Sequence, residues 1–110
     1  MDNQIKHTIT TYETPSGETV NLTLNFFLLY KVKSKHPEIY ERYNEIMLHG
    51  TKDFFDSIHV MYTAYLCANE DAKYDFEEFL KLLGDDIPGV MKKAREIMGG
   101  KKKVNSATPS

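Results

Sequence analysis

The sequence has few of the features that stabilise secreted proteins or anchor proteins in membranes. Its 110 residues contain a single cysteine, Cys67, and no tryptophan. One cysteine excludes an internal disulfide framework, and an intracellular setting is then the simpler expectation. The longest apolar run, Phe26 to Tyr30, is too short to span a bilayer, and residues 1–10 have no apolar signal-peptide core. We therefore expect no membrane association.

The residue groups that carry catalysis or bind metals are also missing. The glycines are scattered single residues apart from Gly99 and Gly100, so the chain has no phosphate-binding loop. The histidines show no zinc-ligand spacing: they are His7, His36, His49 and His59. Asp56, one turn before His59, makes the best acid–base pair, although a structural histidine is more common on a helix rich in aromatic residues. We expect no catalytic residue, metal site or cofactor, and a buried apolar role for Cys67.

The formal net charge is only −2, but the two signs are separated along the chain. Residues 70–86 carry seven acidic side chains and two lysines, whereas residues 92–103 carry six basic side chains and one glutamate. One interpretation is solvated helix faces followed by a basic tail. The other is attraction between opposite ends of neighbouring copies. Because Lys101 to Lys103 have no interleaved aromatic residues, we do not expect nucleic acid as a partner.

Hydrophobic residues make up 41% of the chain, which suffices for one core. Near the N-terminus, apolar and threonine residues alternate with polar ones, and a turn signal interrupts the pattern at residues 15–17. The alternating residues are Ile5, His7, Ile9 and Thr11, then Val20, Leu22 and Leu24. This pattern predicts a β-hairpin. Because an isolated hairpin is marginal in water, it must lie on helices or pair with another chain.

Helical spacing and capping residues predict about five helices after the hairpin. Asn25 caps the first, which runs to about Ser34, although Phe26 to Tyr30 could also extend the strand. The later helices are expected from Pro37 to Gly50, from Thr51 to about Asn69, from Asp75 to Gly84 and from Asp86 to Gly99 and Gly100. The expected fold is mainly α: an N-terminal β-hairpin and a small helical bundle in one domain, residues 1–100. A flexible basic tail, residues 101–110, follows.

Residues 67–78 resemble the end of a calcium-binding EF-hand loop. If Glu78 were the ligand at loop position twelve, positions one and six would fall on Cys67 and Ala72. Those positions require an oxygen ligand and a glycine, and neither is present. Asp75 and Glu78 have the spacing of a helix capping box instead. The sequence therefore predicts a helix start and no calcium site.

Aromatic side chains are the remaining signal for function. The chain has seven tyrosines and six phenylalanines, and tyrosine is favoured at protein interfaces. Tyr40 and Tyr62 are the better interface candidates among the tyrosines. On the long helix, Phe55, Tyr62 and Leu66 form a second apolar stripe that a partner helix could contact, unless the hairpin covers it. The candidate protein-binding surface is therefore Tyr40, Phe55, Tyr62 and Leu66.

Six segments within residues 20–103 carry a family resemblance: LTLNF at 22–26, YERYNEIM at 40–47, GTKD at 50–53, YLCANE at 65–70, FEEFLKLL at 76–83 and GKKK at 100–103. In this order, and with this chain length and basic ending, the sequence resembles the tail assembly chaperones of long-tailed phages that infect Gram-positive bacteria. The segments are helix and cap signatures, so their order is what carries the resemblance.

The resemblance implies a non-enzymatic viral protein of the host cytoplasm, in an infected or lysogenic cell, that is absent from the mature virion. Its partners would be the tape measure protein, which it keeps soluble, and the major tail protein, which it helps to recruit. The family also tends to self-associate, and a longer frameshifted form is frequent. The family supplies no catalytic residues to carry over to this chain.

Two alternatives come from the residues themselves. A small DNA-binding or regulatory phage protein would use Lys92, Lys93 and Arg95 on the last predicted helix, although the acidic residues 70–86 would repel phosphate. A small enzyme would use His59 and Asp56.

Overall fold

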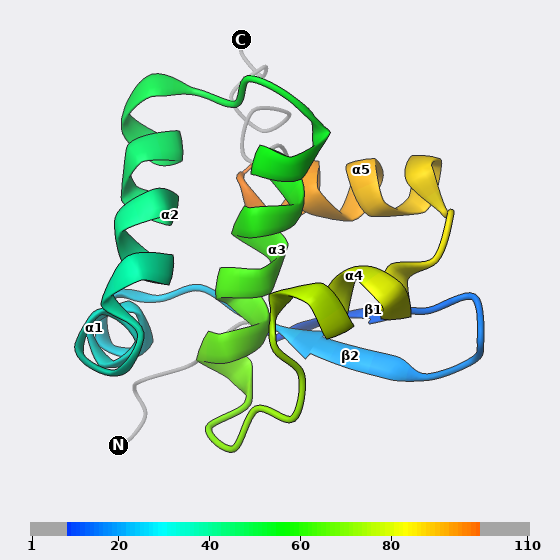
Figure 1. Ribbon diagram of the computed structural model, residues 1–110, viewed down its shortest axis with the longest axis horizontal. Coiled ribbons are helices and arrows are strands. Elements are labelled where there is room, and N and C mark those ends of the chain that lie inside the picture. The colour runs from blue at the N-terminus through cyan, green and yellow to red at the C-terminus, as the bar shows by residue number, and fades with distance from the viewer. Residues whose placement is uncertain (1–8, 100–110) are drawn as a thin grey trace, which may run out of the picture.

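The computed structural model describes residues 9–99, and this part of the chain folds into a two-stranded antiparallel hairpin followed by five helices (Figure 1). The elements are β1 (Thr10–Glu13), β2 (Thr19–Leu22), α1 (Phe26–Lys35), α2 (Pro37–His49), α3 (Phe54–Ala68), α4 (Phe76–Leu83) and α5 (Ile87–Ile97). The predicted fold class, mainly α with an N-terminal hairpin, is confirmed. The predicted strand residues Ile5 and His7 and the predicted tail, 101–110, lie outside the described residues.

The hairpin packs on the helices through one face. β1 pairs with β2 so that Tyr12 lies opposite Val20, and both side chains are buried with Leu22. The prediction that Ile9 and Thr11 lie on the buried face of the hairpin is wrong, because both residues are exposed. An alternating pattern separates the residues of a strand into two faces, but it does not say which face is buried, because a shift of one residue exchanges the two. The face that carries Tyr12 is the buried one, because the Tyr12 ring adds to the hydrophobic core.

α1 and α2 begin at the residues expected from their capping chemistry. The Asn25 side chain accepts a hydrogen bond from the Leu28 amide at 2.9 Å, so residues 26–30 are helical and do not extend the strand. Pro37 occupies the first turn of α2, where a missing N–H costs nothing. Gly50 ends α2 with a φ of 92°, a conformation that glycine adopts without steric cost.

α3 is the central helix and contacts β2, α1, α2 and α5 (Figure 1). Every residue from Val60 to Cys67 is buried, as expected for a helix with apolar side chains around most of its circumference. The predicted cap, Thr51, is wrong: α3 begins two residues later, and Asp53 is its N-cap. The Asp53 carboxylate accepts from the Asp56 amide at 3.2 Å. Both residues are good caps, and Asp56, which accepts from the Lys52 amide and from Arg42 of the preceding helix, favours the start at Asp53.

α4 and α5 cover the remaining side of α3. The capping box predicted at Asp75 and Glu78 is present, with each side chain accepting a hydrogen bond from the other residue's amide. Asp86 caps α5 by accepting from the Gly89 amide at 3.1 Å, and its second oxygen accepts from the Tyr12 hydroxyl at 2.9 Å. This one carboxylate therefore joins the start of α5 to the hairpin. Between residues 9 and 99, no helix combines the length and the apolar character needed to cross a membrane.

Candidate protein-binding surface

The structure separates the four residues predicted to form a binding surface. Phe55 is 57% exposed at the start of α3, and Tyr40 is half-buried on α2. Tyr62 and Leu66 are only 5% and 7% exposed, so they belong to the core. The predicted surface is therefore wrong for these two residues.

Tyr62 is covered by α4 rather than by the hairpin. Its ring contacts those of Phe76 and Phe79, with centroids 5.5 and 5.3 Å away. Its hydroxyl donates a hydrogen bond to the Tyr74 carbonyl at 2.9 Å. Burial raises the pKa of Tyr62 to about 12. Tyr62 is thus a core tyrosine whose polar end has an internal partner.

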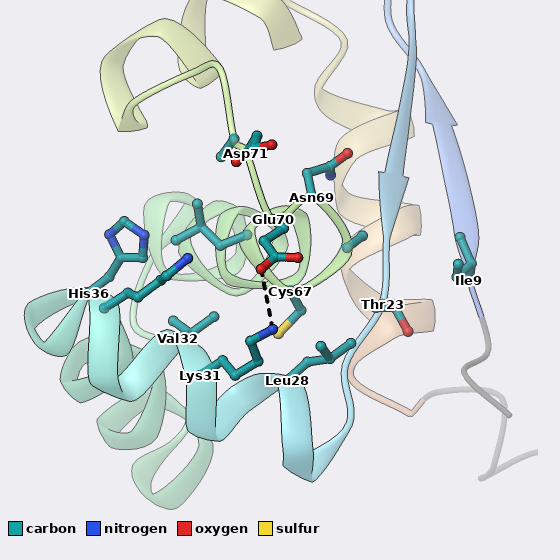
Figure 2. A pocket seen from close by; sticks show the side chains of 14 residues that line it. Ile9, Thr23, Leu28, Lys31, Val32, His36, Cys67, Asn69, Glu70 and Asp71 are labelled. Atoms are coloured by element: carbon teal, nitrogen blue, oxygen red, sulfur yellow. Dashed lines mark ion pairs between the residues drawn. The ribbon is translucent and has the colours of Figure 1, made fainter. Parts of the chain in front are cut away.

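Leu66 is one of the residues that line a cavity of ≈ 410 Å³ between α1 and the end of α3, which Figure 2 shows from close by. Leu28, Val32 and Cys67 line the same cavity, and the Lys31 ammonium pairs with the Glu70 carboxylate at 3.5 Å on its rim. Burial raises the pKa of the Cys67 thiol to about 12, which leaves it protonated and unreactive at neutral pH. The predicted buried role of Cys67 is confirmed.

A second concavity, here called the apolar groove, lies where α3 begins, α4 ends and α5 begins. Its volume is ≈ 240 Å³, and its lining residues are Phe54, Phe55, Ile58, Leu80, Leu83, Gly84, Asp86, Ile87, Val90 and Met91. Phe54, Phe55 and Ile87 are more than half exposed at its edge. Of the predicted surface residues, Phe55 belongs to this groove. Sequence reasoning missed the other members because they come from three elements that only the fold brings together.

A second exposed surface, the α1 aromatic face, consists of Phe26, Phe27 and Tyr30. Their exposed fractions are 92%, 65% and 66%. Residues three and four apart share one side of a helix, so Tyr30 adjoins both phenylalanines. The opposite side of α1 packs inward through Leu28, Leu29 and Val32. The apolar run at 26–30 was visible in the sequence, but which half of it faces solvent is decided by α2 and α3.

The start of α3, and with it the edge of the groove, is held by a buried carboxylate. Asp56 accepts hydrogen bonds from the Lys52 amide at 2.8 Å and from the Arg42 guanidinium of α2. The Lys52 amide, with Arg42, holds the pKa of Asp56 below its usual range despite burial. Arg42 also pairs with Glu45 at 3.5 Å. These bonds fix the link between α2 and α3 and so position Phe54 and Phe55.

The acid–base pair considered from the sequence does not assemble. The Asp56 carboxylate is directed to Arg42 and Lys52, while the His59 ring packs on Phe76 with centroids 5.1 Å apart. The His59 Nε2 atom is buried and finds no hydrogen-bond partner among residues 9–99. Burial and the Arg42 charge lower the pKa of His59, which keeps the ring neutral. Within residues 9–99, histidine, cysteine, aspartate and glutamate form no group of three or more that could hold a metal ion.

The cations considered for DNA binding are distributed over more than one side of α5. Lys93 pairs with Glu96 at 3.0 Å and donates to the Thr10 hydroxyl at 3.1 Å, so it connects α5 to β1. Lys92 and Arg95 are exposed. Lys93 therefore serves an internal contact, which leaves two of the three cations for a partner.

Compared with known proteins, the chain matches no family model, no curated protein and no solved structure. Function is therefore inferred from the surface chemistry of the described residues and from the resemblance in the sequence.

Proposed function

We propose that this protein is a tail assembly chaperone of a long-tailed phage, which binds the tape measure protein, keeps it soluble and helps to recruit the major tail protein. The observation that carries the proposal is the apolar groove, an open concavity edged by exposed Phe54, Phe55 and Ile87. Exposed apolar patches of this kind mark protein-interaction sites on small domains. The cellular setting that goes with this function is the host cytoplasm.

The groove suits a helical client. A tape measure protein is a long helix with apolar stripes, and an amphipathic helix binds a groove through side chains at positions i, i+3, i+4 and i+7. Leu80 and Met91 line the groove, and the flexible methionine adapts to different client side chains. Because the groove is small, each contact is weak, and the client can be released when the tail polymerises.

The decisive experiment is co-expression with the tape measure protein of the same phage. The wild-type chain is expected to keep that client in the soluble fraction and to co-elute with it. The double variant Phe55→Ser/Ile87→Ser removes the exposed edge of the groove, so it is expected to leave the client insoluble.

Leu48→Ser is the matched control, because Leu48 is an exposed apolar residue at the end of α2 and does not line the groove. The control is expected to keep the client soluble. If the client is equally soluble with and without the wild-type chain, the proposed function is wrong. If both variants solubilise it equally, the client does not bind in the groove.

A further inference from the structure

We propose that Tyr12 and Pro15 of the hairpin are positioning residues for the apolar groove, so that client binding and the docking of the hairpin strengthen each other. The client's identity rests on the proposed function, whereas the link between hairpin and groove rests on contacts alone. Neither residue is among those that line the groove. Both contact the α4–α5 link, residues 84–86, which supplies Gly84 and Asp86 to the groove.

The Asp86 carboxylate joins the hairpin to one wall of the groove. Its Oδ1 atom accepts a hydrogen bond from the Gly89 amide at 3.1 Å, and its Oδ2 atom accepts one from the Tyr12 hydroxyl at 2.9 Å. The first bond caps α5, and the second ties the same side chain to β1. The start of α5, which carries the exposed edge residue Ile87, is therefore held in place by the hairpin.

Gly89 provides the space that this carboxylate occupies. A Cβ atom at position 89 would lie 2.1 Å from Asp86 Oδ2 and 2.9 Å from Oδ1. Any side chain there would displace the carboxylate and break its bond to Tyr12. Glycine is otherwise disfavoured in a helix relative to alanine. Its position in the first turn of α5 is explained by the room that the Asp86 carboxylate needs.

Two more contacts hold the same wall against the hairpin. Gly84 has a φ of 64°, and a Cβ atom there would lie 3.3 Å from the Pro15 Cγ atom, so the proline ring packs beside the α4–α5 link. One turn into α5, the Lys93 ammonium donates to the Thr10 hydroxyl at 3.1 Å. Figure 1 shows the hairpin turn and the α4–α5 link on the same side of the molecule.

The two walls of the groove are held by different parts of the chain. The α3 wall, with Phe54 and Phe55, is fixed by the bonds of Asp56 to α2 and to the Lys52 amide. The α5 wall is fixed by the hairpin. A two-stranded hairpin is marginal on its own, so its undocking is a local opening of low cost. Undocking releases the α5 wall alone and so changes the width of the groove.

This arrangement couples two equilibria, client binding and hairpin docking. Coupling between two sites is reciprocal, so a client that needs the positioned wall must stabilise the docked hairpin by the same factor. Couplings in proteins span about 5-fold to 150-fold. Because the critical contact is one hydrogen bond to a half-buried carboxylate, we expect the low end, about fivefold.

Tyr12→Phe removes the critical hydroxyl and keeps the buried ring. Tyr74→Phe is the matched control, because the Tyr74 hydroxyl also donates to a carboxylate of the hairpin segment, Glu18 at 3.2 Å, but neither residue lines the groove. Gly89→Ala is the second test, since it displaces Asp86 from the helix side and leaves Tyr12 intact. Circular dichroism checks that each variant is folded at the assay temperature.

The first measurement is the chaperone concentration that keeps the tape measure protein of the same phage soluble. Tyr12→Phe and Gly89→Ala are each expected to raise it about fivefold, and Tyr74→Phe is expected to leave it unchanged. Because both changes break the same bond, the double variant is expected to need about the same concentration as either single variant, not about 25-fold more. Equal requirements for Tyr12→Phe, Tyr74→Phe and the wild type would overturn the proposal, as would additive effects.

The second measurement is amide hydrogen exchange of β1 and β2 with and without the client. The client is expected to slow this exchange about fivefold in the wild type and in Tyr74→Phe, and less than about twofold in Tyr12→Phe. A general loss of stability would not produce this difference between the two tyrosine variants. Unchanged exchange in a wild-type chain that holds the client overturns the coupling.

A measurement without a client separates this inference from the proposed function. If the wild-type chain does not keep the tape measure protein soluble, the proposed function fails, but the link between hairpin and groove is still tested by methyl NMR of the free protein. Tyr12→Phe is expected to shift the methyl resonances of Ile87, Val90 and Met91, and Tyr74→Phe is expected to leave them in place. Unshifted resonances in Tyr12→Phe show that the hairpin does not position the groove.

Discussion

Asp56 connects α2 to the first turn of α3, and its removal is expected to destabilise the whole domain. Asp56 is only 2% exposed, and its side chain accepts hydrogen bonds from Arg42 and from the Lys52 amide. Asp56→Ala leaves that guanidinium and that amide without their acceptor. It also removes a negative charge from the positive end of the α3 dipole.

The magnitude follows from the exposure of the two partners. Loss of a hydrogen bond to a charged group costs about 1.5–3 kcal/mol, and breaking a fully buried ion pair costs about 3–5 kcal/mol. The Arg42 side chain is 44% exposed, so water can solvate it once Asp56 is gone. The cost therefore falls below the buried-pair range, and we expect Asp56→Ala to lower the free energy of unfolding by about 2–3 kcal/mol.

Urea denaturation at neutral pH measures this difference. The midpoint is expected to fall by about 1–2 M, with an unchanged dependence on urea, for a domain with a slope near 1.5–2 kcal/mol/M. Arg42→Gln is the matched comparison and is expected to cost less, because Asp56 keeps its bond to the Lys52 amide. A loss below about 1 kcal/mol for Asp56→Ala, or an equal loss for both variants, would refute this account.

Acid adds an independent check on Asp56. The Lys52 amide and Arg42 lower the pKa of this carboxyl in the folded protein. The resulting stabilisation is fully present above the unfolded pKa of 3.8 and is lost as pH falls through the folded value. Asp56→Ala is therefore expected to lose less stability than the wild type when the pH is lowered below 3.8.

Three further predictions concern single side chains. Burial lowers the pKa of His59, so below pH 6.5 the unfolded chain binds a proton that the folded chain does not. The free energy of unfolding therefore decreases as the pH is lowered through this range. His59→Leu is expected to flatten this part of the pH profile in thermal unfolding. Asp75→Ala removes the capping box and is expected to cost about 1 kcal/mol in urea, whereas Glu77→Ala, in the same turn, costs less than half of that. Cys67, with its pKa raised to about 12, is expected to react slowly with an aromatic disulfide reagent in buffer and fast in urea; rapid labelling of the folded protein contradicts its burial.

Helix starts were predictable because their chemistry is local. The capping box at Asp75 and Glu78, the Asn25 cap and the Pro37 start each involve residues within four positions of one another. The third helix was the exception. Thr51 and Asp53 are both suitable caps, and the choice depends on the Lys52 amide bond to Asp56 and on Arg42 from α2. Local pattern therefore fails where a contact from another helix sets the boundary.

The candidate surface was predictable only in part because helical spacing identifies apolar sides without saying what covers them. Tyr62 and Phe55 lie on one apolar stripe, yet α4 buries the first and leaves the second exposed. Membership of the groove depends on three helix ends that meet in space, so Phe55, Leu80 and Ile87 share no sequence pattern.

The central position of α3 also has a consequence for synthesis on the ribosome. β2, α1 and α2 all pack on α3, although they precede it in the chain. A nascent chain that ends before Phe54 thus lacks the surface on which Leu22, Val32 and Ile46 become buried. These side chains can therefore complete their burial only after α3 has left the exit tunnel.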